Sequence, residues 1–235
     1  MLPLLLLPGM LCDSASLRAQ VADLADVASP RVMGYGDADS FEAMADRVLA
    51  DAPPRFALAG HSMGGRVAQE VYRKAPERVA ALALLATDYR GMVSEEMRAT
   101  ETARREAMLA KAKADGMEAF ARMWVKQVVA PANLENTALV DDAVAMMARQ
   151  SFDSFAAQSL AGLKRPDYTD MLGRVACPTL ICPGELDMLR PVAVHAEMVA
   201  RVPGAKLVVI KGAAHMVAME RPAEVTAALR DWLTA

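Results

Sequence analysis

The sequence predicts an α/β protein with a doubly wound, mostly parallel sheet of about six strands and an inserted helical region. Two observations lead to this prediction. Short apolar runs alternate along the chain with segments whose apolar residues follow helical spacing. The runs are apolar at successive positions, which is typical of parallel strands covered by helices on both faces. We therefore expect a core formed by residues 1–87 and 167–235 and a helical insertion, or cap, at residues 88–166.

The first part of the core is predicted from four apolar runs and the helices between them. The runs occupy residues 4–7, 31–33, 55–59 and 79–86. Ser14 or Ser16 is placed to cap the first helix, whose apolar positions are Leu17, Val21, Leu24 and Ala28. Ser40 is placed to cap the second helix. Pro76 ends the third helix, because proline cannot continue a helix.

The middle of the chain shows amphipathic helices and no convincing strand. Helical spacing of apolar residues recurs in the segments 120–128, 140–147 and 152–160. The charged run 98–113 is predicted to form a solvated helix face without a binding role. The alternation then resumes, with strands expected at 178–182 and 206–210 and helices at 192–202 and 220–233.

Composition excludes several classes of protein. The chain has 235 residues, of which 54% are hydrophobic and 23% charged, with a net charge of −3. This balance excludes a disordered chain and disfavours a nucleic-acid partner. Three cysteines without a CxxC pair fit a reducing compartment, and no apolar run reaches the roughly 18 residues of a membrane span. We therefore expect a cytoplasmic protein with neither a membrane nor a nucleic-acid partner.

The most specific motif is Gly-His-Ser-Met-Gly-Gly at residues 60–65, between a predicted strand and a predicted helix. A strand that turns abruptly into a helix strains the residue at the turn, and flanking glycines relieve the crowding. The Ser62 hydroxyl would then project above the sheet, and the amide of Met63 would lie at a helix N-terminus. This arrangement predicts that Ser62 is a nucleophile.

A serine nucleophile needs a base, and the chain has three histidines. His61 adjoins Ser62, so the two side chains should point apart, and His61 is expected to pack beneath the turn. His195 lies within a predicted helix and is expected to have a surface role. His215 lies in a loop after a predicted strand, at the sheet edge where open α/β folds build their sites. His215 is therefore the expected base.

The base in turn needs an orienting carboxylate. Asp187 follows the strand predicted at 178–182 and is the favoured candidate. Glu185 is a nearby competitor, and Asp88 is a rival because it follows the strand next to that of the nucleophile. With Asp187 the order along the chain is serine, aspartate, histidine.

These motifs resemble those of the α/β-hydrolase superfamily, in its branch of small esterases and lactonases with a helical cap. The resemblance lies in residues 4–10 (LLLLPGM), 60–65 (GHSMGG), 177–187 (CPTLICPGELD), 212–216 (GAAHM) and the tail from Glu220. It implies an α/β-hydrolase fold, with Ser62 as nucleophile, His215 as base and Asp187 as its orienter. It also implies an oxyanion hole formed by the backbone amides of Met10 and Met63.

The chain departs from the family pattern in three places. Pro8 stands where the family usually has a histidine, and Ala214 replaces a frequent glycine. The usual opening hairpin is missing, so one edge of the sheet is expected to be shortened. An exposed edge strand can pair with a second copy, and either a monomer or a homodimer is therefore expected.

The resemblance implies hydrolysis of carboxylic esters or lactones with small to medium apolar groups, through an acyl-enzyme. The pocket is expected to involve Leu11, Cys12, Met123, Trp124, Met188 and Met216. Methionine side chains suit pockets for irregular apolar groups. No cofactor is expected, and no metal, because the histidines lie apart and no H-E-x-x-H occurs.

Two alternatives remain open from the sequence. One is a carbon–carbon bond hydrolase of aromatic degradation, which would use the same site on a different bond. The other is a ligand-binding protein that kept the fold and turns over little.

Overall fold

Six parallel strands form one sheet in the order β2-β1-β3-β4-β5-β6. The computed structural model describes residues 1–234, so Ala235, the last residue of the expected core, lies outside the described part. The strands are β1 (Leu2–Leu7), β2 (Ala28–Val32), β3 (Phe56–His61), β4 (Val79–Leu85), β5 (Thr179–Cys182) and β6 (Lys206–Leu207). The predicted doubly wound α/β fold is confirmed.

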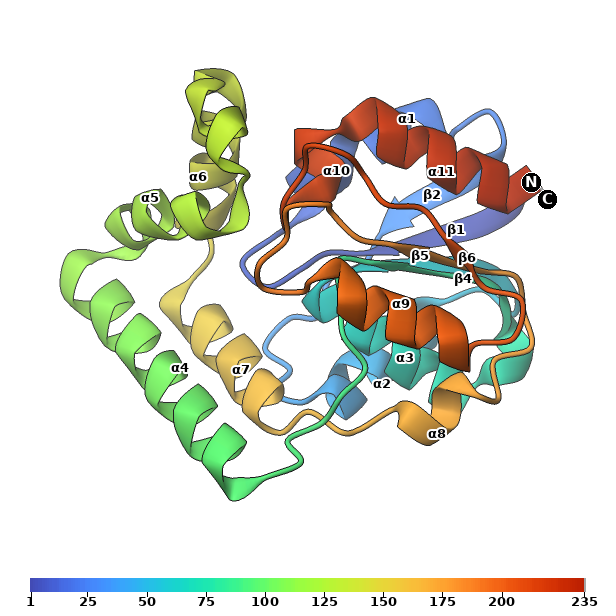
Figure 1. Cartoon of the computed structure of the whole chain (residues 1–235), viewed down its shortest axis with the longest axis horizontal. Helices are drawn as coiled ribbons and strands as arrows, with labels where there is room; N and C mark the ends of the chain where they lie inside the picture. Colours follow the sequence, from blue (N-terminus) through green and yellow to red (C-terminus); the bar gives the residue numbers. More distant parts are fainter. Residues whose placement is uncertain (235) are drawn as a thin grey trace.

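Helices cover both faces of the sheet (Figure 1). One face carries α1 (Arg18–Asp23), α10 (Val217–Glu220) and α11 (Pro222–Thr234). The opposite face carries α2 (Phe41–Asp51), α3 (Met63–Lys74), α8 (Thr169–Leu172) and α9 (Val192–Arg201). Short 3-10 helices occur at η1 (Ser14–Leu17), η2 (Pro76–Arg78) and η3 (Pro131–Glu135).

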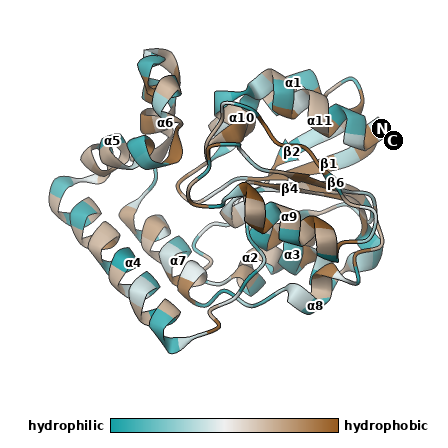
Figure 2. Ribbon diagram, viewed as in Figure 1, coloured by the Kyte–Doolittle hydropathy of each residue, from teal (hydrophilic) through white to brown (hydrophobic). Residues whose placement is uncertain are grey.

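The central strands are buried on both sides, as their continuous apolar sequence predicts. In β1, Leu5 and Leu7 pack with α2 and α3, whereas Leu4 and Leu6 face α1 and α11. All four leucines are at most 2% exposed. Figure 2 shows the same pattern, with the strands largely hydrophobic and the outer faces of the helices hydrophilic. Burial of this kind stabilises the fold by roughly 1.5–3 kcal/mol for each large apolar side chain.

Four further helices lie between β4 and β5 in the chain and stand to one side of the sheet (Figure 1). We call them the helical segment; they are α4 (Glu95–Asp115), α5 (Met117–Val128), α6 (Thr137–Ala148) and α7 (Phe152–Leu163). They share a hydrophobic cluster that includes Phe120, Trp124 and Phe155, and it reaches Leu11 and Met216 of the sheet layer. No helix within residues 1–234 is both long and apolar enough to cross a bilayer.

Three elements differ from the sequence prediction. The first helix, α1, ends at Asp23, because Ala28 pairs with Leu2 in the sheet instead of continuing the helix. Strand β2 accordingly starts earlier than predicted and includes Pro30, which an edge strand tolerates because one side needs no ladder donor. Strand β6 is shorter than predicted, and the sheet resumes only as a single bridge between Gly184 and Ile210.

The turn between β3 and α3 requires glycine on both sides. A Cβ atom on Gly64 would lie 2.1 Å from the backbone oxygen of Leu7, and one on Gly60 would lie 2.2 Å from the oxygen of Gly64. Both obstacles are backbone atoms, which cannot swing away as a side chain can. The close approach of β1, β3 and α3 therefore depends on these two residues.

We expect Gly64→Ala to destabilise the protein by about 3 kcal/mol or more, because the added methyl group meets the β1 backbone. Thermal unfolding of the purified variant measures the effect. Gly173→Ala is the matched control, since its added Cβ would meet nothing closer than 4.0 Å. Equal melting temperatures for the two variants would contradict this account of the turn.

Candidate active site

Ser62 occupies the strained turn between β3 and α3. Its backbone has φ 53° and ψ −112°, a conformation that a residue with a side chain rarely adopts. The Ser62 amide donates to the oxygen of Leu85 at 2.8 Å. The Ser62 carbonyl accepts from the Gly65 amide at 3.0 Å and from the Thr87 hydroxyl at 2.7 Å. These bonds hold the strained conformation and direct the hydroxyl away from the sheet.

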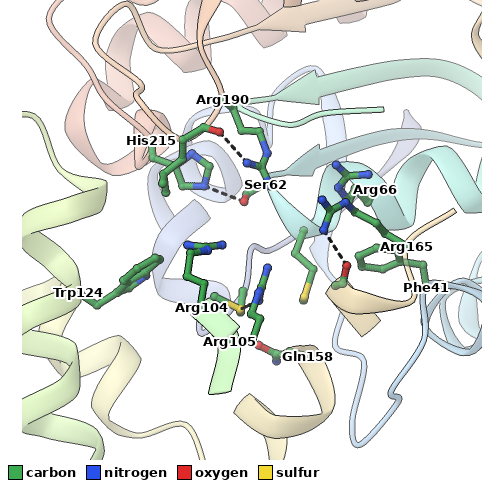
Figure 3. A pocket seen from close by; sticks show the side chains of 14 residues that line it. Phe41, Ser62, Arg66, Arg104, Arg105, Trp124, Gln158, Arg165, Arg190 and His215 are labelled. Atoms are coloured by element: carbon green, nitrogen blue, oxygen red, sulfur yellow. Dashed lines mark hydrogen bonds between the residues drawn. The ribbon is translucent and has the colours of Figure 1, made fainter. Parts of the chain in front are cut away.

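The Ser62 hydroxyl, His215 and Asp187 form a continuous hydrogen-bonded chain. The Ser62 hydroxyl donates to Nε2 of His215 at 2.7 Å (Figure 3). Nδ1 of His215 donates to Oδ2 of Asp187, also at 2.7 Å. His215 lies in the histidine loop, residues 211–216, and Asp187 lies in the loop after β5. The structure thus brings together the three side chains that the sequence analysis selected.

Asp187 is held as a charged group. It is 2% exposed, and its Oδ1 accepts the backbone amides of Leu189 at 2.8 Å and Arg190 at 2.9 Å. Burial alone would raise the pKa of the Asp187 carboxyl, but the charge and hydrogen bond of His215 and these two amides lower it below its ordinary value. An ionised carboxylate at Nδ1 keeps the other nitrogen, Nε2, free to accept a proton from the serine.

The two rival carboxylates lie elsewhere. Asp88 accepts the amides of Tyr89 and Arg90 at 2.7 and 3.0 Å. It also lies 3.6 Å from the Arg66 guanidinium. Glu185 accepts the amide of Gly212 at 2.9 Å. Neither carboxylate forms a hydrogen bond with a histidine within residues 1–234.

The histidine loop is anchored by Glu220, which the sequence analysis did not select for this role. Glu220 is 5% exposed. Its Oε1 accepts the amide of Ala214 at 3.0 Å, and its Oε2 accepts the amide of Ala130 at 2.8 Å and the side-chain amide of Asn133 at 2.7 Å. Val128 at the end of α5 accepts the next two loop amides at 3.0 and 3.1 Å. A single buried carboxylate therefore joins the loop to the helical segment.

The other two histidines are buried and structural. His61 lies beneath the turn as expected, and its Nε2–H donates to the carbonyl of His215 at 2.7 Å. The surface role expected for His195 is wrong, because this residue is 0% exposed. Its Nε2 accepts the Thr87 amide at 3.0 Å, and its Nδ1–H donates to Pro191. Because the Thr87 hydroxyl holds the Ser62 carbonyl, His195 supports the nucleophile turn from behind.

Met10 and Met63, whose amides are the expected oxyanion donors, line one cavity together with Ser62. Met63 begins α3, and Met10 follows β1 in a tight turn in which the Cys12 amide donates to Gly9 at 3.1 Å. Neither the Met10 nor the Met63 amide donates a hydrogen bond to another group within residues 1–234. Leu11 has φ 62°, and its amide donates to Gln158 of α7 at 2.9 Å. The turn is therefore also fixed from the helical segment.

Two cavities meet at Ser62. The larger has about 590 Å³ of empty space and is rich in arginine (Figure 3); it is lined by Met10, Phe41, Ser62, Met63, Arg66, Arg104, Arg105, Trp124, Gln158, Gly162, Arg165, Leu189, Arg190 and His215. The smaller has about 300 Å³ and is mainly apolar; it is lined by Gly9, Met10, Cys12, His61, Ser62, Trp124, Val128, Met147, His215 and Met216. Ser62 thus borders one cationic and one apolar cavity.

Half of the expected pocket residues line these cavities. Trp124 lines both of them, and Cys12 and Met216 line the smaller one. The expectation is wrong for Met188, which is 86% exposed, and for Leu11, which is buried within the hydrophobic cluster. It is also wrong for Met123, which is half-buried against the hydrophobic cluster of the helical segment and lines neither cavity. Sequence patterning does not fix which way a loop or helix face turns.

The arginines of the larger cavity were missed. The charged run of α4 was expected to form a solvated helix face, and this is wrong for Arg104 and Arg105, which line the cavity.

The nearby thiol and carboxylate groups offer no second reactive centre in the described part of the chain. Burial raises the pKa of the Cys12 thiol to about 12, so this thiol, which lines the smaller cavity with Ser62, stays protonated. Residues 1–234 hold no cluster of three or more His, Cys, Asp or Glu side chains suited to a metal ion.

Buried His61 makes stability sensitive to acid. Burial and the nearby His215 lower its pKa to about 4, whereas an unfolded histidine has a pKa of about 6.5. Between these pH values the unfolded chain binds a proton that the folded chain does not. The free energy of unfolding therefore falls as the pH drops from about 6.5 towards about 4, by about 3 kcal/mol at most.

Urea unfolding between pH 7.5 and 4.5 measures this dependence. His61→Gln keeps a side-chain N–H that can donate to the His215 carbonyl, but it does not titrate. We expect this variant to be less stable at pH 7.5 and to lose less stability than the wild type on acidification. An identical slope in the two proteins would show that His61 is not the group responsible.

Comparison with known proteins agrees with this architecture. The model of the alpha/beta hydrolase family matches residues 4–229. A pimeloyl-[acyl-carrier protein] methyl ester esterase of Aliivibrio salmonicida is 26% identical over 202 residues, which cover 86% of this chain and 76% of that protein. A putative carbamate hydrolase of Klebsiella pneumoniae is 27% identical over 215 residues, which cover 88% of this chain and 77% of that protein.

Among solved structures, a thermophilic esterase from Thermogutta terrifontis is similar to the whole chain. Its TM-score is 0.88 and its sequence identity is 29%, and the matched region covers 100% of this chain and 90% of that chain. The family match, which spans nearly all of the chain, establishes that this protein belongs to the alpha/beta hydrolase family.

Proposed function

We propose that the protein is a serine hydrolase that cleaves carboxylic esters or lactones through an acyl-enzyme. The observation that supports this most directly is the hydrogen-bonded chain from the Ser62 hydroxyl through His215 to Asp187. A serine hydroxyl is a weak nucleophile unless a base accepts its proton during attack. The similarity to proteins named as esterases favours an ester bond over a carbon–carbon bond.

The first half of the reaction follows from the positions of these groups. Ser62 Oγ attacks the ester carbonyl carbon while Nε2 of His215 takes the hydroxyl proton. Asp187 stabilises the imidazolium that forms, and it holds the ring in the required orientation. The amides of Met10 and Met63 donate to the oxygen that becomes negatively charged, a contribution worth roughly 3–4 kcal/mol for each donor in comparable sites.

The second half regenerates the enzyme. The imidazolium of His215 gives its proton to the departing alcohol oxygen, the carbon–oxygen bond breaks, and the acyl group remains on Ser62. Water then loses a proton to His215 and attacks the acyl carbonyl, which releases the acid and restores the serine hydroxyl. The same residues serve both halves, and a small-molecule substrate suffices.

Replacing Ser62 by alanine should remove both covalent labelling and turnover. A fluorophosphonate probe reacts with an activated serine, and we expect it to label the wild type and not Ser62→Ala. Intact-protein mass spectrometry measures the labelling, and hydrolysis of p-nitrophenyl acetate and butyrate measures the turnover. Equal labelling of the two proteins would contradict Ser62 as the nucleophile. Turnover confined to carbon–carbon substrates such as dienone acids would reject the ester assignment.

Asp187→Asn should lower kcat by roughly 10³–10⁴-fold, because an amide facing Nδ1 favours the wrong histidine tautomer. The substitution keeps the size of the side chain, and we expect little change in fold. Glu185→Gln is the matched control in the same loop. It removes a charge but keeps an oxygen for the Gly212 amide, and we expect kcat to stay within about threefold of wild type. Steady-state kinetics with p-nitrophenyl butyrate compares the two variants. A similar loss of kcat in both would refute the assigned role of Asp187.

A further inference from the structure

Five arginines from separate parts of the chain converge on the larger cavity at Ser62 (Figure 3). Arg66 comes from α3, and Arg104 and Arg105 come from α4. Arg165 lies after α7, and Arg190 lies in the loop before α9. No single helix or loop brings the five arginines together. Their side chains meet only because the helical segment and the sheet layer both border the cavity.

The nearby carboxylates do not balance this charge. Glu101 lies 3.0 Å from Arg104, 2.9 Å from Arg105 and 3.8 Å from Arg165. Although burial opposes it, Arg104 and Arg105 lower the pKa of Glu101 to about 2. Glu101 is therefore one fixed negative charge shared among three cations.

The second carboxylate, Asp88, lies 3.6 Å from Arg66 and is also paired with Arg90, at 3.2 Å. The triad carboxylate Asp187 is bound behind His215. Arg190 forms no ion pair within residues 1–234. Five guanidinium groups thus face two carboxylates, and the cavity carries a clear excess of positive charge.

Several of these guanidinium groups also have hydrogen-bond donors to spare. Arg66 is only 4% exposed, and the Asp88 oxygen 3.6 Å from its Nη2 is too far for a hydrogen bond. The buried Nε of Arg165 also has no hydrogen-bond acceptor within residues 1–234. Arg190 donates only to the neighbouring carbonyl of Leu189, at 2.6 Å. Buried donors without acceptors destabilise a protein by about 1–3 kcal/mol each, so a ligand oxygen that accepts from them would stabilise it.

Arg78 has a structural role in the same chain, and its hydrogen bonds can be compared with those of Arg66. Its guanidinium donates to the carbonyls of Leu49, Ala52 and Pro53 at 3.3, 2.8 and 2.9 Å. By contrast, Arg66 donates to one carbonyl, that of Arg90, at 3.0 Å. Burial and the charge of Arg190 lower the pKa of Arg66 to about 9, so it still carries its charge at neutral pH.

We propose that the arginine-lined cavity binds an anionic group, a carboxylate or a phosphate, on the ester that Ser62 cleaves. This inference rests on the proposed function and specifies its substrate class. Guanidinium groups bind carboxylate and phosphate oxygens in paired, charge-assisted hydrogen bonds. The smaller apolar cavity, which Ser62 also lines, receives a compact apolar group. The substrate is thus an ester that is anionic on one side of the scissile bond and apolar on the other.

A matched pair of esters tests the proposal. Monomethyl adipate and methyl hexanoate have the same length and differ only in a terminal carboxylate or methyl group. Release of acid in a pH-stat at neutral pH gives kcat/KM for each ester. We expect the anionic ester to be preferred by about tenfold or more, since a hydrogen bond to a charged group contributes about 1.5–3 kcal/mol. Added NaCl should weaken the preference.

Arg190→Met tests whether the arginines cause this preference. Arg190 is half-buried and has no carboxylate partner within residues 1–234, so the substitution should leave the fold intact. We expect the ratio of the two kcat/KM values to fall by about tenfold. Arg98→Met is the matched control, because Arg98 is exposed on α4 and does not line the cavity. It should leave the ratio at the wild-type value.

Inhibition experiments distinguish a carboxylate ligand from a phosphate ligand. Adipate and inorganic phosphate are compared as competitive inhibitors of methyl hexanoate hydrolysis, with NaCl at equal ionic strength as the blank. Stronger inhibition by adipate assigns the cavity to a carboxylate, and stronger inhibition by phosphate assigns it to a phosphate. Inhibition by neither beyond the NaCl blank overturns the proposal.

Failure of this inference can be told apart from failure of the proposed function. Equal kcat/KM for the two esters, with a ratio unaffected by Arg190→Met, overturns the anionic substrate and leaves the serine hydrolase standing. If neither ester is cleaved and Ser62 is not labelled, the proposed function fails. Thermal shifts of Ser62→Ala with adipate or phosphate then report on the cavity alone. A rise in melting temperature that disappears when Arg190→Met is added to Ser62→Ala supports the anion site. No change in melting temperature with either anion overturns it.

Discussion

The crowded turn at Ser62 is the constraint on which the rest of the site depends. Backbone from β1, β3 and α3 meets there at distances that exclude a side chain at two glycines. The strained serine is then held by the bond that its amide donates to Leu85 and by the bond that its carbonyl accepts from Thr87. His195 fixes Thr87 from behind. The position of the Ser62 hydroxyl therefore depends on packing that extends through Thr87 to His195 of α9.

The sequence predicted those parts of the structure that depend on local pattern. Continuous apolar runs identified the four central strands, because parallel strands inside a sheet are buried on both faces. The glycines around Ser62 identified the turn, because only glycine permits the close approach. His215 and Asp187 were found by their position after strands, since the carboxyl ends of parallel strands lie at one edge of the sheet.

The missed features depend on how distant segments pack. The five arginines lie on α3, α4 and two loops, and no spacing in the sequence relates them. The α4 run looks like a solvated face, and only the packing of α4 against α5 and α7 turns two of its arginines towards the cavity. Glu220 was missed as an anchor for the same reason, because its partners are 6, 87 and 90 residues away along the chain. Met188 shows the converse error, since proximity to Asp187 in sequence did not bring it into the pocket.

The bonds that join the histidine loop to the end of α5 also determine how the molecule can move. Two amides of the loop bind Val128, and Glu220 binds both the loop and the residues that follow α5. Separating the two parts would break several bonds of about 0.5–1.5 kcal/mol each. A movement that kept these bonds intact would carry the end of α5 and the His215 imidazole together. A helical segment that opened in this way would have to move at its other end, around α4, and would leave the distance between His215 and Ser62 unchanged.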